Sequence, residues 1–348
     1  MYPIGFPALI SAIDKGTSAE INARYGWEGP VEIAGGSSWG STMCDSGADF
    51  IRVWCGAKDD FRLYIGRSAN GLDWHDVAEI PQRGSQVEPA ICGYIEGGHR
   101  KLFMMWRGIE GDEELYWAVN EDPTKLAGFN PQQKVPNGRS PNRPTLAWTG
   151  HSILAAWRED DQSIWWSEFR DGTWKSPNSI PWVGTYWGPS LAVIDHTAYL
   201  FWGGKEQDAY KRTWMATLYL GAFGVTDLSI WTQQQEVLQI QTVQSPDALP
   251  VSASLIGVDT QFAPTVCVRE GLIYLTYQST NGARLTALTP VVGKIAGITG
   301  PMAWNGSIEV PLPQYVSFNI GMAAKGGQLV LACRGPKDDR KMYAVAIG

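Results

Sequence analysis

The sequence has few of the residues on which metal and nucleophilic catalysis usually depend. Its 348 residues include only four histidines and five cysteines. The cysteines stand singly along the chain, at Cys44, Cys55, Cys92, Cys267 and Cys333. Without CxxC pairs or paired histidines, a zinc cluster, a disulfide framework and a Ser-His-Asp triad are all unfavourable interpretations. We therefore expect neither a metal nor a cofactor, and the odd number of thiols favours a reducing compartment.

Charged residues and long apolar runs are scarce as well. Asp, Glu, Lys and Arg make up 18% of the chain, the net charge is −7, and no basic run is present. An acidic surface repels phosphate backbones and anionic lipids, so we expect no nucleic-acid partner and no membrane partner. No stretch approaches the roughly 18 apolar residues of a membrane-spanning helix, and Met1 to Ser11 lacks the segments of a signal peptide. We expect a soluble protein without membrane insertion, cytoplasmic or secreted after removal of a signal.

Tryptophan, glycine and proline are abundant by contrast, with 17, 39 and 21 residues. This composition is typical of aromatic β-strands separated by many turns. One short string recurs six times: an aromatic residue, a few polar or proline positions, and then β-branched or aliphatic residues. Its aromatic residue is Trp27, Trp74, Phe129, Trp174, Trp231 and Trp304 in turn, at spacings of 45 to 73 residues.

A second recurring feature lies between the copies of this string. It is a five- or six-residue apolar strand, at residues 50–54, 102–106, 153–157, 198–202, 272–277 and 329–333. A shorter strand precedes it and a third strand follows it after a polar turn. Four strands in a unit of about 40 to 55 residues is the pattern of propeller blades. We expect an all-β, six-bladed β-propeller with four-stranded blades; seven blades are the alternative, because the unit at 241–312 is long.

The order of the strands indicates how the ring closes. The last unit has three strands before the sequence ends, whereas Trp27 to Ile33 is a fourth-strand motif without a blade of its own. We expect this N-terminal strand to complete the sixth blade, because closure removes exposed sheet edges. The expected single propeller domain spans residues 1–348, with blades near 34–84, 85–139, 140–184, 185–240, 241–312, and 313–348 plus 1–33.

The third unit carries a resemblance to a known superfamily. Its segments 143–147, 153–157, 164–167 and 172–177 resemble the repeats of bacterial and fungal lectin-like propellers, including the fungal fucose-specific lectins. The resemblance implies sugar sites built from an Arg, a Glu and a stacking aromatic in each blade. Here the blades diverge: the residue after the second-strand aromatic is Cys55, Arg107, Arg158, Gly203, Gln278 and Arg334 in turn. Fungal hetero-Diels-Alderases look like catalytic relatives of such propellers, by analogy of fold.

A further resemblance, to the sialidases, rests on one turn. Ser68 to Trp74 is similar to the Asp-box hairpin of those enzymes, with Asn70 in place of the Asp. Sialidase chemistry needs three inner-strand arginines, a Tyr nucleophile paired with a Glu, and an acid. The segment around Arg52 lacks the proline of the family's motif, and no ordered arginine trio follows. A sialidase-like glycosidase is therefore only the third functional hypothesis.

Candidate ligand-binding residues lie in the loops that lead into the innermost strand of each blade, because these loops converge on one face of a propeller. The expected substrate-binding residues are Trp39, Arg107, Asn142, Tyr186, Trp187, Phe262, Phe318, Asn319 and Arg334. The expected catalytic residues are Glu88, Arg143 and Arg158. An interblade ion pair is the structural alternative for Glu88 and Arg143. The acid pairs at 59–60, 160–161 and 338–339 are interpreted as turn caps.

Two functions from different classes fit these residues. In the main hypothesis, one central aromatic pocket binds an apolar or aromatic small molecule and catalyses a metal-free, non-hydrolytic reaction, a hetero-Diels-Alder cycloaddition or a dehydration with cyclisation. Arg143 or Arg158 would stabilise an oxyanion, and Glu88 would act as general acid or base. In the alternative, the protein is a carbohydrate-binding lectin whose aromatic rings stack on a glycan ligand. The divergent blades slightly favour the first, because lectins gain avidity by repeating a site.

Overall fold

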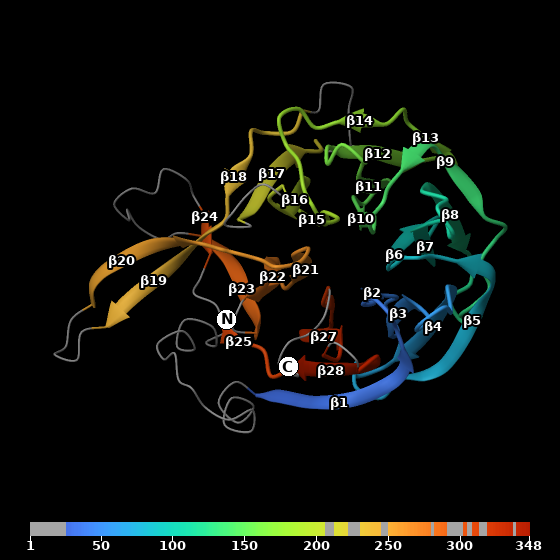
Figure 1. Cartoon of the computed structure of the whole chain (residues 1–348), viewed down its shortest axis with the longest axis horizontal. Coiled ribbons are helices and arrows are strands. Elements are labelled where there is room, and N and C mark those ends of the chain that lie inside the picture. The colour runs from blue at the N-terminus through green and yellow to red at the C-terminus, as the bar shows by residue number, and fades with distance from the viewer. Residues whose placement is uncertain are drawn as a thin grey trace.

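The chain folds into six β-sheets arranged around one axis, and it is a six-bladed β-propeller (Figure 1). The computed structural model describes residues 26–205, 212–221, 230–244, 250–279, 282–290, 302–304, 308–312, 319–336 and 339–348. The first strand of every blade contacts the first strands of the two neighbouring blades, so these six strands surround the axis. In this described part, no helix is long and apolar enough to cross a membrane.

Blades 1 to 3 are antiparallel sheets that follow one another along the chain. Blade 1 contains β2 (Thr42–Asp45), β3 (Phe50–Cys55), β4 (Arg62–Ser68) and β5 (His75–Gly84). Blade 2 contains β6 (Ala90–Glu96), β7 (His99–Arg107), β8 (Glu114–Asn120) and β9 (Gln133–Arg139). Blade 3 contains β10 (Thr145–Trp148), β11 (Ile153–Arg158) and β12 (Ile164–Arg170), with β13 (Thr173–Trp174) and β14 (Asn178–Ser179) both paired to β12.

Blades 4 and 5 continue the ring, and blade 5 is extended by a hairpin. Blade 4 contains β15 (Ser190–Ile194), β16 (Thr197–Gly203), β17 (Thr213–Tyr219) and β18 (Gln235–Glu236). Blade 5 contains β21 (Thr265–Arg269), β22 (Leu272–Ser279), β23 (Gly282–Pro290), β24 (Met302–Trp304) and β25 (Ile308–Glu309). The hairpin of β19 (Leu238–Gln244) and β20 (Pro250–Gly257) joins that sheet through β24 and projects outward (Figure 1). The long fifth unit therefore forms an extended blade and not a seventh one.

Blade 6 is completed from the other end of the chain, as the sequence predicted. It contains β26 (Gly321–Lys325), β27 (Gln328–Arg334) and β28 (Lys341–Ile347), and its fourth strand is β1 (Trp27–Gly36). Strand β1 runs antiparallel to β28, with Trp27 opposite Ile347 and Ile33 opposite Met342. This pairing confirms the expected closure. It satisfies the backbone edge of β28 that would otherwise face solvent.

The recurring tryptophans build the blades. Trp54, Trp106, Trp157 and Trp202 end the second strands of blades 1 to 4, and all four are among the largest fully buried side chains. Trp27, on the fourth strand of blade 6, is 4% exposed and packs with Tyr274 of blade 5 and Leu329 of blade 6. It therefore lies between blades 5 and 6.

Replacing Trp27 tests how far β1 holds the ring closed. We expect Trp27→Ala to lower the free energy of unfolding by about 3–5 kcal/mol, because it leaves a cavity between blades 5 and 6. The matched control is Trp182→Ala: Trp182 is 96% exposed, and we expect a change below about 0.5 kcal/mol. Chemical denaturation followed by circular dichroism measures both. Equally small losses in the two variants would contradict a closing role for β1.

Candidate functional site

The loops that lead into the innermost strands share one turn, which the sequence analysis missed. A serine or threonine hydroxyl donates to a main-chain oxygen two or three residues further on, at 2.6–3.1 Å, in the pairs Ser37–Gly40, Ser140–Asn142, Thr185–Trp187 and Thr260–Phe262. In blade 2 the hydroxyl of Ser85 accepts from the Val87 N–H instead. The signal was present in the sequence, because a Ser or Thr stands three residues before each of Gly40, Glu88, Arg143, Gly188 and Ala263.

Three arginines brace these loops from the preceding blade. Arg107 Nη1 donates to the Pro141 oxygen at 3.3 Å. Arg158 Nε and Arg334 Nη1 donate in the same way to the oxygens of Thr185 and Ser38, at 3.2 Å and 2.8 Å. Arginine at the end of a second strand thus positions the loop of the next blade. Their expected part in ligand binding or catalysis stays a prediction.

Glu88 links blade 2 to the loops of blades 1 and 6. Its Oε1 accepts hydrogen bonds from the Gly40 N–H at 2.9 Å and from Asn319 Nδ2 at 3.0 Å. Glu88 is 2% exposed and Asn319 is 8% exposed. A Cβ atom at Gly40 would lie 3.0 Å from Glu88 Oε1 and 2.6 Å from the Asn319 oxygen. Only glycine leaves room at this position for the side chain that ties blade 2 to blades 1 and 6.

Arg143 makes the corresponding link from blade 3. Its Nη2 donates to the Pro264 oxygen and to Thr265 Oγ1, both at 3.1 Å, at the start of blade 5. The side chain passes Gly188 of blade 4, where a Cβ atom would lie 2.8 Å from Arg143 Cγ. Burial lowers the pKa of Arg143, and the charge of Glu88 partly opposes this.

Glu88 and Arg143 form no ion pair in the part of the chain that the structure describes; each has separate partners. Beneath them, the axis holds a hollow of about 60 Å³. Its wall includes the inner-strand residues Thr42, Ala90, Thr145, Ser190, Thr265 and Gly321. Ligand pockets for drug-sized molecules measure roughly 300–1,000 Å³. The axis is therefore nearly filled at this level.

Five of the expected residues do come together on the loop face. The rings of Tyr186, Trp187 and Phe262 form a continuous aromatic ledge. The ring centroids of Tyr186 and Trp187 lie 5.0 Å apart, and those of Trp187 and Phe262 lie 5.5 Å apart. Asn142 Nδ2 donates to the main-chain oxygen of Tyr186 at 3.1 Å, and Arg158 Nε donates to the main-chain oxygen of the neighbouring Thr185. Tyr186 is 37% exposed, and the other two rings are half-buried. The aromatic ledge with Asn142 and Arg158 is our candidate functional site.

The remaining expected residues lie elsewhere on the ring or outside the described part. Trp39 packs partly buried against the hydrophobic cluster of blades 1 and 2. Asn319 and Arg334 hold the loop of blade 1 through Glu88 and Ser38. Phe318 lies outside the described residues.

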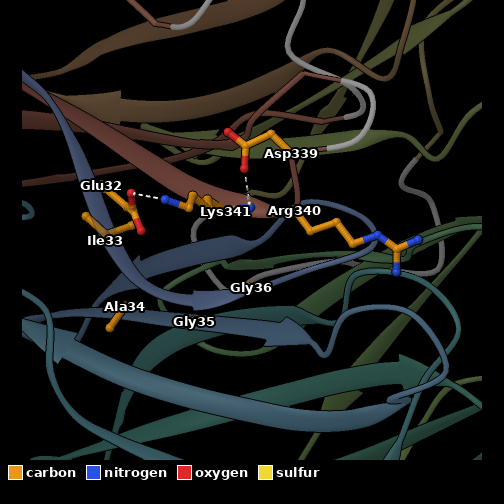
Figure 2. A pocket seen from close by; sticks show the side chains of 8 residues that line it. All are labelled: Glu32, Ile33, Ala34, Gly35, Gly36, Asp339, Arg340 and Lys341. Carbon is orange, nitrogen blue, oxygen red and sulfur yellow. Dashed lines mark hydrogen bonds and ion pairs between the residues drawn. The ribbon is translucent and has the colours of Figure 1, made fainter.

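A larger hollow of about 670 Å³ lies between β1 and the start of β28 (Figure 2), and its wall does not include the aromatic ledge. The Lys341 ammonium contacts Glu32 at 2.8 Å across it, and the Lys341 N–H donates to Asp339 at 3.0 Å. Figure 2 shows Arg340 pointing away from this ion pair. The wall is largely main chain and exposed charge, and it contains none of the expected site residues.

The sialidase-like turn is a structural hairpin between β4 and β5. Asn70 Oδ1 accepts from the N–H groups of Leu72 and Asp73 at 2.9 Å, and the Trp74 indole donates to the Gly71 oxygen at 2.8 Å. Arg52 is fully buried beside Trp74, 4.9 Å from its ring centroid, and burial lowers the pKa of Arg52 to about 9. Asn therefore closes this turn as an Asp would.

The turns between the second and third strands are capped by aspartates, as expected for Asp60, Asp161 and Asp339. Each carboxylate accepts from the N–H two residues on, at 2.9–3.1 Å. Asp112 does the same in blade 2 and was missed, because no second acid precedes it. Tyr343 also donates to Asp339 at 2.6 Å. In this described part, no three His, Cys, Asp or Glu side chains gather as metal ligands would.

Comparison with known proteins gives a likeness of fold. The sequence matches no family model and no curated protein. The structure is similar to a subtype N11 neuraminidase-like protein of A/flat-faced bat/Peru (H18N11), with TM-score 0.54, 8% identity, and coverage of 92% of this chain and 93% of that one. A subtype N10 neuraminidase-like protein of A/little yellow-shouldered bat/Guatemala matches with TM-score 0.52 and 12% identity, over 92% of this chain and 98% of that one.

A fungal lectin is similar to the same degree. The six-bladed lectin of Aleuria aurantia, described with a fucose recognition mode, matches with TM-score 0.55 and 9% identity over 85% of this chain and 88% of that chain. At such identities the comparison shows the fold alone. It agrees with the closed ring of six blades.

The turn caps predict a pH dependence of stability. Hydrogen bonds from Arg62, Ser163 and Tyr343 lower the pKa of Asp60, Asp161 and Asp339 respectively. A lowered folded-state pKa adds stability that is complete above the unfolded value of about 3.9 and is lost as pH falls through the folded value. The urea concentration at the unfolding midpoint should therefore decrease as the pH is lowered below about 4.

Asp339→Asn should reduce the size of this acid-induced fall. Asp171→Asn is the matched control, because the Asp171 side chain is 89% exposed, and its pH dependence should match that of the wild type. An identical acid profile for Asp339→Asn and the wild type would contradict a stabilising role for the caps.

Proposed function

We propose that the protein is a carbohydrate-binding, lectin-like propeller whose site is the aromatic ledge with Asn142 and Arg158. The observation that carries the proposal is the exposure of Tyr186 beside two further rings and two polar side chains. A Tyr or Trp ring offers a flat apolar face together with a polar edge. Sugars present the matching combination of C–H faces and hydroxyl groups.

The polar side chains give the ledge the means to orient a sugar. The amide of Asn142 has two N–H donors and an acceptor oxygen, and its Nδ2 is anchored on Tyr186. The guanidinium of Arg158 has five N–H donors, and its Nε holds Thr185. Both groups are thus fixed in place beside the rings, so they are oriented before a ligand arrives.

Among the described inner loops, those of blades 1 to 5, the proposed site occurs once. The residue that follows the loop Ser or Thr by two positions is Trp39, Val87, Asn142, Trp187 and Phe262 in blades 1 to 5. Aromatic residues stand at this position in two consecutive blades only at blades 4 and 5, where Tyr186 also adjoins them. A single site gains no avidity within one chain. The likeness to the Aleuria aurantia lectin supports carbohydrate as the ligand class.

The catalytic hypothesis receives less support. A metal-free cyclisation at the axis would need Glu88 and Arg143 to face a substrate-sized pocket. Both are nearly fully buried and hold neighbouring blades, and the adjoining hollow measures about 60 Å³. Arg158 alone of the expected catalytic residues adjoins the aromatic ledge. Binding without catalysis is therefore the better-supported proposal.

Paired tyrosine variants test the proposed site. Tyr186→Ala should weaken glycan binding by roughly tenfold or more, because it removes one stacking face. Tyr219→Ala is the matched control: Tyr219 is 70% exposed at the opposite end of blade 4, and its loss should leave binding unchanged. A glycan array identifies the ligand, and isothermal titration calorimetry measures both variants.

The same calorimetry decides between the two functions. No glycan bound by the wild type at millimolar concentration would overturn the proposal. So would a polycyclic aromatic ligand whose binding is lost in Glu88→Gln and retained in Tyr186→Ala.

A further inference from the structure

Four side-chain hydroxyl groups lie in the wall of the hollow on the propeller axis, those of Thr42, Thr145, Ser190 and Thr265. The Thr42 hydroxyl donates to the Pro89 oxygen at 2.6 Å, and the other three act as acceptors. Thr145 Oγ1 accepts from the Leu191 N–H at 3.1 Å, and Ser190 Oγ accepts from the Val266 N–H at 3.2 Å. Thr265 Oγ1 accepts from Arg143 Nη2 at 3.1 Å. A hydroxyl group carries one hydrogen to donate. None of these three hydroxyls donates it to any residue in the described part of the chain.

Arg143 adds a buried positive charge to the same wall. It is 5% exposed and lines the hollow, and its Nε has no hydrogen-bond partner among the described residues. An isolated buried cation is costly unless a negative charge compensates it. The charge of Glu88 opposes this cost only in part, because Glu88 forms no ion pair with Arg143 among the described residues and does not line the hollow.

We propose that this hollow binds one small monovalent anion of the halide class, held by the Arg143 guanidinium and the hydroxyls of Thr145, Ser190 and Thr265. An anion accepts hydrogen bonds from every side and donates none, which matches the wall. A water molecule would bring two more hydrogens to a wall already rich in donors. A metal cation would be repelled by Arg143.

The size of the hollow sets the size of the ion. At about 60 Å³, it exceeds the roughly 10–15 Å³ that a cavity needs to hold one water molecule. It is well below the roughly 300–1,000 Å³ of pockets for drug-sized ligands, so it suits a small ion with a few water molecules. The four ligating groups come from blades 3, 4 and 5. The bound ion would therefore link three blades at the axis, and binding would stabilise the closed ring. This inference is independent of the proposed sugar site on the loop face.

Bromide is the probe for the test, because it scatters X-rays anomalously. Crystals grown in sodium bromide should show an anomalous peak on the axis beside Arg143 and Thr265. In solution, the thermal midpoint should rise by roughly 2 °C or more for each tenfold increase in bromide above the dissociation constant. Sodium methanesulfonate at equal ionic strength, whose anion is too large for the hollow, should not produce this rise.

Two variants separate binding from general stability. Thr265→Val keeps the side-chain shape but removes the hydroxyl, and both the peak and the bromide-dependent rise should be lost. Arg52→Met is the matched control, because Arg52 is equally buried but lies beside Trp54 and Trp74. That variant should be less stable yet keep the rise.

The outcomes against the proposal are equally distinct. Identical midpoints of the wild type in bromide and methanesulfonate would overturn it. An axial peak without any midpoint shift would mean binding at crystal concentration only and would overturn it as well. Arg143→Met removes the charge and should likewise lose the peak and the rise. If that variant fails to fold, the comparison of Thr265→Val with Arg52→Met still decides.

Discussion

The pairing of β1 with β28 is the contact on which the rest of the structure depends. It joins the first described strand of the chain to the last, and Trp27 packs behind it between blades 5 and 6. Closure also brings Arg334 of blade 6 to the Ser38 oxygen, and Asn319 to Glu88. Loops from opposite ends of the chain are therefore held at one face. Without that ring, Glu88 of blade 2 would lose Asn319 of blade 6 as its hydrogen-bond donor.

Two buried side chains determine where a ligand can bind. Glu88 passes Gly40 of blade 1, and Arg143 passes Gly188 of blade 4, so the two glycines stand on opposite blades of the ring. The Glu88 and Arg143 side chains are both buried, and hydrogen bonds to fixed protein groups replace those that they would make to water. The axis becomes a structural plug with a small polar hollow beneath it. The axis therefore leaves little room for a larger ligand, and our proposed site lies on the loops, where Tyr186 is exposed beside the half-buried rings of Trp187 and Phe262.

The sequence predicted the fold well because the signals for blades are local. A buried Trp54 or Trp157 at the end of a second strand needs only its own hairpin, and the spare fourth-strand motif at Trp27 indicated closure. The site was predicted less completely. The sequence showed which residues belong to the inner loops, but the directions of the Glu88 and Arg143 side chains depend on glycines in the adjacent blades, Gly40 and Gly188. The Ser or Thr that precedes the inner strand in each of the five described loops was also present in the sequence. It was not predicted to be a turn signal, because hydroxyl groups are common in any turn.

The proposed sugar site also depends on hydrogen bonds from side chains to the main chain of a loop. Thr185 Oγ1 fixes the Trp187 oxygen, Asn142 fixes Tyr186, and Arg158 fixes Thr185, so three side chains order one aromatic loop. Ordering of the loop occurs when the protein folds and is not repeated when a ligand binds. A weakly interacting ligand such as a sugar can then use most of its contact energy for affinity. On our proposal, this fixed loop is what would allow one aromatic ledge to bind a sugar without the avidity of repeated sites.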